Sequence, residues 1–248
     1  MNVIQIDSTD STNSWMAENE SSIPSPSLVF CNRQTAGRGQ RGNSWESAPG
    51  ENITASLIFH PMDFPASRQF SISEAISLAI VEFLQDLGVV AMVKWPNDIY
   101  VGDRKICGIL VENVVMEKTI SRCIAGFGIN INQKRFLSDA PNPVSLSLLT
   151  GIDFDVPLLV EKLAFILDKY LGLLGSRDML HQKFLRNLWR RDGNFYNFYD
   201  KVKNEPLKAY IHDVSPEGYI TLITNEGESR DFAFKEVEYV INHGIVKP

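Results

Sequence analysis

The spacing of apolar residues along the chain predicts several amphipathic helices. Over residues 71–87, apolar side chains recur every three or four positions, which places them along one face of an α-helix. Residues 156–174 repeat this spacing directly after Asp155, a residue type that favours helix N-termini. Residues 179–189 predict a third long helix, and Ser11 precedes a shorter one. Each of these helices needs an apolar surface to pack against.

Alternating or short apolar runs predict that this surface is a β-sheet. Strands are expected at residues 3–6, 28–31, 52–60, 89–93, 99–101, 105–112 and 120–131. Gly102 and Asp103 are expected to form the turn of a hairpin between two of them. Because strands and helices do not alternate regularly, the pattern indicates an α+β fold. We expect a mixed β-sheet with flanking helices, and not a Rossmann fold.

The pattern changes towards the C-terminal end of the chain. Beyond about residue 195 the apolar runs become short and alternating, with turn residues at 215–218 and 225–227. We therefore predict two domains, a larger one over residues 1–194 and a small β domain over residues 195–248.

Composition and charge limit the function classes. Hydrophobic residues make up 44% of the 248 positions and charged residues 22%, as in ordinary globular proteins. The formal net charge of -6 gives no overall attraction to nucleic acid or anionic lipid. The three cysteines show no CxxC spacing, so neither a disulfide framework nor a zinc site is expected. Without a signal peptide or a long apolar stretch, the sequence predicts a cytoplasmic protein.

Residues 34–50 are the most unusual segment of the chain. Gly37, Gly39 and Gly42 give it the form GxGxxG, but a dinucleotide-binding fingerprint needs a helix directly afterwards, and residues 43–50 do not predict one. What remains is a long loop with two guanidinium groups and many free backbone N–H groups. Such a loop suits a phosphate or an adenylate, and a solvated surface loop is the alternative.

Two further segments are candidates for substrate binding. In residues 94–98, Lys-Trp-Pro-Asn-Asp, the proline fixes the direction in which the chain leaves its strand. The lysine and the aspartate could form a salt-bridged turn, or they could bind substrate polar groups and a metal. By the two-residue period, Lys105 is expected to share a strand face with Cys107, Ile109 and Val111. A lysine there is costly unless it is paired or binds an anion, and an edge lysine after a turn is the alternative.

Taken together, these segments resemble the biotin–protein ligase family. The glycine- and arginine-rich loop with Trp45, the segment 94–98 and the strand 103–112 are similar to three family motifs. Ser11-Thr12-Asn13 and residues 126–130 match two more, and all five stand in the family's order over residues 10–132. The resemblance implies a biotin- and ATP-binding catalytic core related to class II synthetases, followed by a small SH3-like C-terminal domain.

The resemblance also implies roles for individual residues. The catalytic groups would be Lys105, Arg38 and Arg41. The biotin-binding residues would be Ser11, Thr12, Asn13, Gln34, Gly37, Arg38, Lys105 and Gly108. The nucleotide-binding residues would be Arg38, Gly39, Gln40, Arg41, Trp45, Asn52, Lys105 and Asn130. Mg²⁺ would be held through the phosphates, with Asp98 as a candidate ligand. Gln40 departs from the family pattern, since many members have arginine there.

The implied activity is AMP-forming ligation. Biotin would be activated with ATP to biotinyl-5′-AMP and then transferred to a lysine of a biotin carboxyl carrier protein. A lipoate or octanoate ligase or transferase of the same fold, and a non-enzymatic biotin sensor, are the alternatives. No helix-turn-helix precedes residue 1, unlike in repressor-type members, so neither a nucleic-acid nor a membrane partner is expected. A homodimer is left open.

Overall fold

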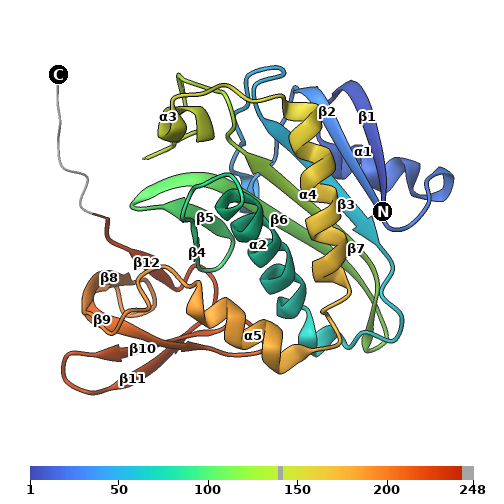
Figure 1. Cartoon of the computed structure of the whole chain (residues 1–248). Helices are drawn as coiled ribbons and strands as arrows, with labels where there is room; N and C mark the ends of the chain where they lie inside the picture. Colours follow the sequence, from blue (N-terminus) through green and yellow to red (C-terminus); the bar gives the residue numbers. More distant parts are fainter. Residues whose placement is uncertain (139–141, 242–248) are drawn as a thin grey trace.

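The fold combines a large mixed sheet with a second, smaller sheet, as the computed structural model shows (Figure 1). The structure describes residues 1–138 and 142–241, and at Arg41 the backbone alone. The expected α+β class is confirmed. The second sheet starts at Tyr196, close to the predicted domain boundary, while the division into domains at residue 194 stays a prediction.

The first sheet has seven strands in the order β1-β2-β3-β7-β6-β5-β4. β1 runs parallel to β2, and every other neighbouring pair is antiparallel. The seven strands agree with the expected ones, although β4 is short and begins later than predicted. Their bounds are β1 Asn2–Thr9, β2 Ser27–Gln34, β3 Ile53–Phe59, β4 Met92–Lys94, β5 Asp98–Val101, β6 Arg104–Met116 and β7 Thr119–Ile129.

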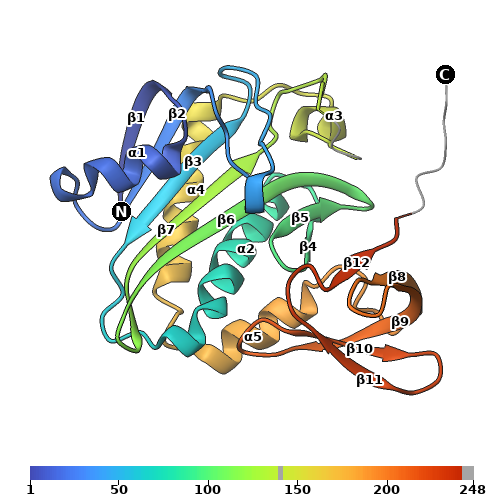
Figure 2. The same ribbon diagram turned by 180° about the vertical axis from the view of Figure 1, so that it is seen from behind.

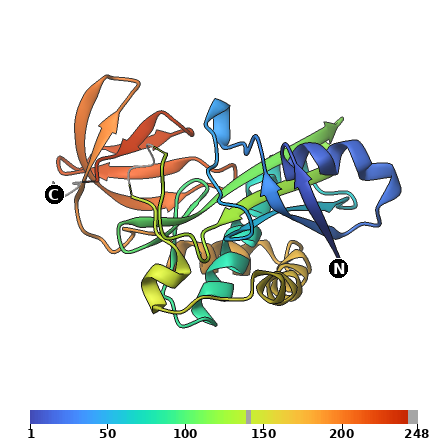
Figure 3. The ribbon, with the colours of Figure 1, turned by 90° about the horizontal axis from the view of Figure 1, so that it is seen from above.

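Helices cover both faces of this sheet (Figures 2 and 3). α2 (Phe70–Gln85) and α4 (Val156–Leu171) lie on one face, α5 (Arg177–Arg186) packs on α2, and α1 (Thr12–Asn19) lies on the other. Asp155 caps α4 as expected, because its side chain accepts a 3.1 Å hydrogen bond from the Leu158 N–H. None of the described helices is long and apolar enough to cross a membrane.

Four short helical segments of the described residues were not predicted from the sequence, because each has too few residues to show an apolar stripe. They are α3 Leu146–Thr150 and the 3₁₀ turns η1 Glu20–Ser22, η2 Gln40–Gly42 and η3 Ala66–Arg68. The turn η2 lies inside the glycine-rich loop, where it sets the path of residues 40–42.

The second sheet is antiparallel, with strand order β11-β10-β9-β8-β12. It meets the first sheet at Trp95, which is only 1% exposed and donates a 3.0 Å hydrogen bond from Nε1 to the carbonyl of Gly218. Phe234 packs against the same indole. The indole thus ties the small sheet to the segment 94–98. The strand bounds are β8 Tyr196–Asp200, β9 Glu205–Val214, β10 Ile220–Thr224, β11 Ser229–Phe232 and β12 Val237–Tyr239.

A β-bulge in β6 corrects the expected orientation of Lys105. Tyr100 lies opposite Lys105, but Ile99 lies opposite Cys107, so Ile106 is an extra residue on β6. Because residues opposite each other on paired strands point to the same face, Lys105 and Cys107 point to opposite faces. The expectation that Lys105 shares the apolar face of Cys107 was therefore wrong. Cys107 is fully buried in the core, whereas Lys105 faces a cavity.

Candidate active site

A cavity of about 1150 Å³ lies over β6 and β7, bounded by the glycine-rich loop and by the second sheet. It brings together most of the residues singled out in the sequence: Ser11, Thr12, Asn13, Gln34, Arg38, Gly39, Gln40, Trp45, Asp98, Lys105, Gly108 and Asn130. Gly37 and Asn52 do not line it, and the side chain of Arg41 lies outside what the structure describes. The five matched segments therefore converge on one site.

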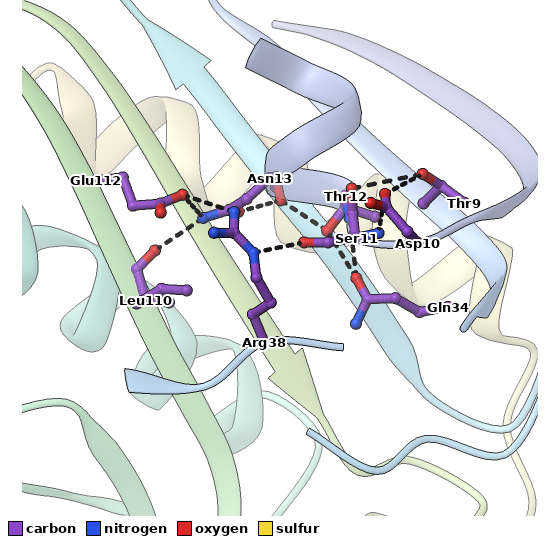
Figure 4. A network of polar contacts seen from close by, with 10 residues as sticks. Thr9, Asp10, Ser11, Thr12, Asn13, Gln34, Arg38, Leu110 and Glu112 are labelled. Carbon is purple, nitrogen blue, oxygen red and sulfur yellow. Dashed lines mark hydrogen bonds and ion pairs between the residues drawn. The ribbon is translucent and has the colours of Figure 1, made fainter. Parts of the chain in front are cut away.

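One end of the cavity is a polar network around the start of α1 (Figure 4). The side-chain oxygen of Gln34 accepts hydrogen bonds from the Thr12 backbone N–H at 2.9 Å and from the Thr12 hydroxyl at 3.3 Å. Arg38 Nε donates to Ser11 Oγ at 3.5 Å. Since Ser11 is the N-cap residue of α1 and its side chain makes no capping bond, the hydroxyl is available to this network. The hydroxyl and amide groups of this network suit a neutral polar group of a ligand.

Glu112 organises the same end of the cavity, although the sequence argument gave it no role. Its Oε2 accepts hydrogen bonds from Asn13 Nδ2 at 2.7 Å and from Arg38 Nη2 at 3.2 Å (Figure 4). Asn13 fits because Gly126 lies below it: a Cβ on Gly126 would come within 2.1 Å of Asn13 Oδ1. Glu112 stands four residues after Gly108 on β6, and an even spacing places two strand residues on the same face. This spacing could have identified Glu112 as a residue of this site.

Two lysines and one aspartate form the charged part of the site. Lys105 Nζ lies 2.6 Å from one carboxylate oxygen of Asp98, and Lys94 Nζ lies 3.6 Å from the other. Lys94 also lies over the rings of Tyr100, at 5.2 Å, and Tyr239, at 4.8 Å. Burial lowers the pKa of Lys94, the charge of Asp98 opposes this shift, and Lys105 adds to it. The site therefore concentrates positive charge that an anionic ligand can neutralise.

The same contacts limit how these residues could bind Mg²⁺. Both carboxylate oxygens of Asp98 are paired with ammonium groups. The described residues hold no group of three His, Cys, Asp or Glu side chains placed for a metal. Magnesium prefers several oxygen ligands in octahedral geometry, which these residues do not offer. They do not fit a metal held by the protein alone, and Asp98 as a magnesium ligand stays a prediction.

Trp45 forms an aromatic wall on a bare part of the sheet. Gly108 and Gly128 lie opposite each other on β6 and β7, and a Cβ on Gly128 would come within 2.2 Å of the Trp45 indole. Lys105 Nζ lies 5.6 Å from the centre of that ring. The indole Nε1 is buried and has no hydrogen-bond partner among residues 1–138 and 142–241. A flat aromatic surface beside a cation suits a purine with its phosphate.

Two amide oxygens of cavity-lining residues are buried without a hydrogen-bond partner among the described residues. Asn130 is 3% exposed and donates from Nδ2 to the Val144 carbonyl at 3.1 Å, while its Oδ1 has no partner in the described part of the chain. The same holds for the side-chain oxygen of Gln40. An unsatisfied buried acceptor is costly, so each of these oxygens favours a ligand that brings an N–H or O–H donor.

Gly37 and Asn52 act behind the cavity wall. A Cβ on Gly37 would come within 2.4 Å of the Trp45 carbonyl oxygen, so the loop can fold this tightly only with glycine there. Asn52 Nδ2 donates to Gln133 Oε1 at 2.6 Å, and its Oδ1 accepts from the Ile131 N–H at 2.9 Å. The geometry supports positioning roles for both, and their direct contact with a ligand stays a prediction.

The cavity thus places two lysines and an aromatic ring beside one strand, an arrangement that suits an anionic, nucleotide-like ligand. Residues 3–130 match the Biotin/lipoate A/B protein ligase family, and the chain belongs to this family. It is 31% identical over 228 residues to the bifunctional ligase/repressor BirA of Salmonella typhimurium, covering 91% of this chain and 68% of that protein. It is 29% identical over 130 residues to the biotin–[acetyl-CoA-carboxylase] ligase of Paracoccus denitrificans, covering 50% and 52%.

A solved structure shares the fold over almost the whole chain. The biotin protein ligase of Aquifex aeolicus, in complex with biotin and ATP, superimposes with a TM-score of 0.79 at 22% identity. The match covers 96% of this chain and 99% of that one. The small second sheet is therefore part of the shared architecture.

Proposed function

We propose that this chain is an ATP-dependent biotin–[biotin carboxyl carrier protein] ligase that forms biotinyl-5′-AMP as its intermediate. The observation that carries the proposal is the placing of Lys105. Its ammonium lies 2.6 Å from Asp98 and 5.6 Å from the centre of the Trp45 ring, in the cavity that Ser11, Thr12 and Gln34 also line. Biotin's ureido ring would occupy the polar end, and the adenine would occupy the aromatic end.

In the first step, a biotin carboxylate oxygen attacks the α-phosphorus of ATP. The bond to the oxygen that bridges to the β-phosphate breaks, and pyrophosphate leaves with that electron pair. Negative charge grows on the phosphate oxygens in the transition state. Lys105 and Arg38 are cations held in advance where this charge develops, and such groups typically contribute about 10²–10³ in rate.

In the second step, the neutral amine of the carrier lysine attacks the carbonyl carbon of the mixed anhydride. The amide bond forms, the bond from carbon to the AMP oxygen breaks, AMP leaves with the electron pair, and the amine proton passes to solvent. The same cations stabilise the departing AMP. The covering loop of residues 37–50 excludes water, which would otherwise hydrolyse the anhydride.

The cavity supports biotin over lipoate or octanoate. A ureido ring has two N–H donors and one carbonyl acceptor, and Ser11, Thr12, Gln34 and Asn13 present hydrogen-bonding side chains for both. An aliphatic chain or a dithiolane would cover these polar side chains without offering them a hydrogen bond, which disfavours such a ligand. Lys105 inside the cavity supports an enzyme over a passive sensor, because biotin recognition alone needs no cation beside the α-phosphate.

The test is transfer of label to a carrier. Purified protein, ATP, Mg²⁺ and an apo biotin carboxyl carrier domain are incubated with biotin, lipoate or octanoate, and acylation is measured by mass spectrometry and a streptavidin blot. We expect the carrier to be modified in the reaction with biotin and not in those with lipoate or octanoate. We also expect biotin-dependent exchange of pyrophosphate into ATP. Modification by lipoate or octanoate at an equal rate, or biotin binding without exchange, would overturn the proposal.

The proposal extends to partners and location. The carrier is a biotin carboxyl carrier protein or domain, the reaction takes place in the cytoplasm where ATP is available, and Mg²⁺ arrives with the nucleotide phosphates. We propose no nucleic-acid or membrane partner for this chain, on the basis of its charge of -6. A sequence-specific gel shift with biotin and ATP present would contradict that part. Sedimentation with and without biotin and ATP decides between a monomer and a homodimer.

A further inference from the structure

Glu46 connects the glycine-rich loop to a second wall of the cavity. One carboxylate oxygen accepts from the Leu137 N–H at 2.9 Å, and the other accepts from Leu137 at 3.0 Å and from the Ser138 N–H at 2.6 Å. Glu46 follows Trp45 directly in the sequence, and Phe136 and Ser138 line the cavity. Leu137 and Ser138 stand 91 and 92 positions after Glu46 in the sequence, so its carboxylate joins two loops that are distant along the chain.

Gln133 strengthens this connection. Its Nε2 donates to Glu46 at 2.9 Å, and its Oε1 accepts from the Ala48 N–H at 2.9 Å and from Asn52 Nδ2 at 2.6 Å. Each loop thus both donates and accepts hydrogen bonds across the gap. Burial alone would raise the pKa of Glu46, but the hydrogen bonds from Leu137, Ser138 and Gln133 together lower it. The carboxylate is therefore charged at neutral pH, which is the form that accepts these bonds.

We propose that Glu46 is a positioning residue that holds the two walls together and so sets how long the adenylate intermediate stays in the site. This inference rests on the proposed function. Trp45 and Phe136 line the cavity from the two connected walls, so an adenylate held there would be released when the walls separate. Separation breaks the hydrogen bonds to a charged acceptor, and such bonds are stronger than neutral ones.

The decisive variant is Glu46→Gln. It keeps the size of the side chain, but one acceptor oxygen becomes an NH₂ group that faces N–H donors. Glu51→Gln is the matched control, because Glu51 directly follows the loop and is an exposed carboxylate whose side chain makes no polar contact among the described residues. Gln133→Ala breaks the connection from the other wall and serves if the first variant is unstable.

The measurement is the dissociation of synthetic biotinyl-AMP, followed by stopped-flow fluorescence. We expect Glu46→Gln and Gln133→Ala to release it about tenfold faster than the wild type. The melting temperature of the free protein should stay unchanged, and Glu51→Gln should release biotinyl-AMP at the wild-type rate. Faster release should also increase biotinylation of a bystander protein such as serum albumin.

The proposed function and the role of Glu46 would be overturned by different results. If the wild type does not bind biotinyl-AMP, the proposed function fails. If the wild type binds it and Glu46→Gln releases it at the wild-type rate, the proposed function stands and the role of Glu46 is overturned. The role of Glu46 would also be overturned if Glu46→Gln lowered the free energy of unfolding by as much as it changed the free energy of adenylate release. Glu46 would then serve general stability.

Discussion

Gly108 and Gly128 lie directly opposite each other on β6 and β7, and the indole of Trp45 covers both. Two adjacent positions without a Cβ leave a shallow hollow on an otherwise covered sheet face. The hollow explains why the ring can lie against the two strands, with its centre 5.6 Å from Lys105 Nζ. The arrangement couples a residue of the loop to two residues of the sheet.

Gly128→Ala should therefore displace Trp45. The new methyl group would lie 2.2 Å from the indole, a distance at which the ring must move. If the ring stacks on the nucleotide base, its loss should weaken ATP binding by about 1–3 kcal/mol, roughly fivefold to a hundredfold. Calorimetric titration with ATP and biotin measures this. Gly175→Ala is the control, because a Cβ there meets no atom within 4 Å, and equal affinities in all three proteins would contradict the stacking role.

Lys105→Met should abolish biotin activation and leave the fold intact. The methionine keeps the length of the side chain, so the change removes a charge and little packing. Exchange of pyrophosphate should fall by about 10²–10³. Asp98 keeps Lys94 at 3.6 Å, and Lys105 is 28% exposed, so the free energy of unfolding should change by less than about 1 kcal/mol. Lys208→Met, on the exposed side of β9, is the control, and near wild-type exchange in Lys105→Met would remove Lys105 from the mechanism.

Gln40→Arg should slow the release of biotinyl-AMP. Gln40 lines the cavity, and its amide oxygen has no hydrogen-bond partner in the described ranges. An arginine there can form charge-assisted hydrogen bonds to the phosphate, worth about 1.5–3 kcal/mol, which corresponds to roughly tenfold to hundredfold slower release. Stopped-flow dissociation in both proteins provides the comparison. Identical rates would mean that this position does not reach the ligand.

His181 should make the packing of α5 depend on pH. Its Nδ1 lies 2.6 Å from Glu74, which is 2% exposed on α2, and its Nε2 lies 3.9 Å from Asp213 on β9. The hydrogen bond to Glu74 raises the pKa of His181 above the ordinary value of 6.5, against the effect of burial. Because the folded-state pKa is raised, this stabilisation is complete below 6.5 and is lost as the pH rises through the raised pKa.

Urea unfolding of the wild type and His181→Gln across that range tests this effect. The difference between the two should be about 1.5 kcal/mol or more at the acidic end and should shrink as the pH rises. His212→Gln is the control, since no carboxylate contacts that ring in the described part of the structure. A difference that stays constant with pH would show that His181 contributes by packing alone.

The elements with clear local periodicity could be predicted from the sequence, and the long-range contacts could not. α2 and α4 follow from their apolar stripes, and the cavity residues between Ser11 and Asn130 follow from motif resemblance. The bulge at Ile106 could not be predicted, because it depends on the register against β5, and a strict two-residue period placed Lys105 on the wrong face. Glu46 was missed for the same kind of reason, since its partners lie about 90 residues away and no local pattern indicates them.

The position of Tyr239 has a consequence for the synthesis of the protein. Tyr239 belongs to β12, yet its ring lies 4.8 Å from the ammonium of Lys94 on β4 and lines the cavity. A ribosome makes Lys94 long before Tyr239, so the seven-stranded sheet can form while the cavity still lacks one wall. The nascent chain therefore acquires its complete binding site only after β12 has emerged and paired with β8.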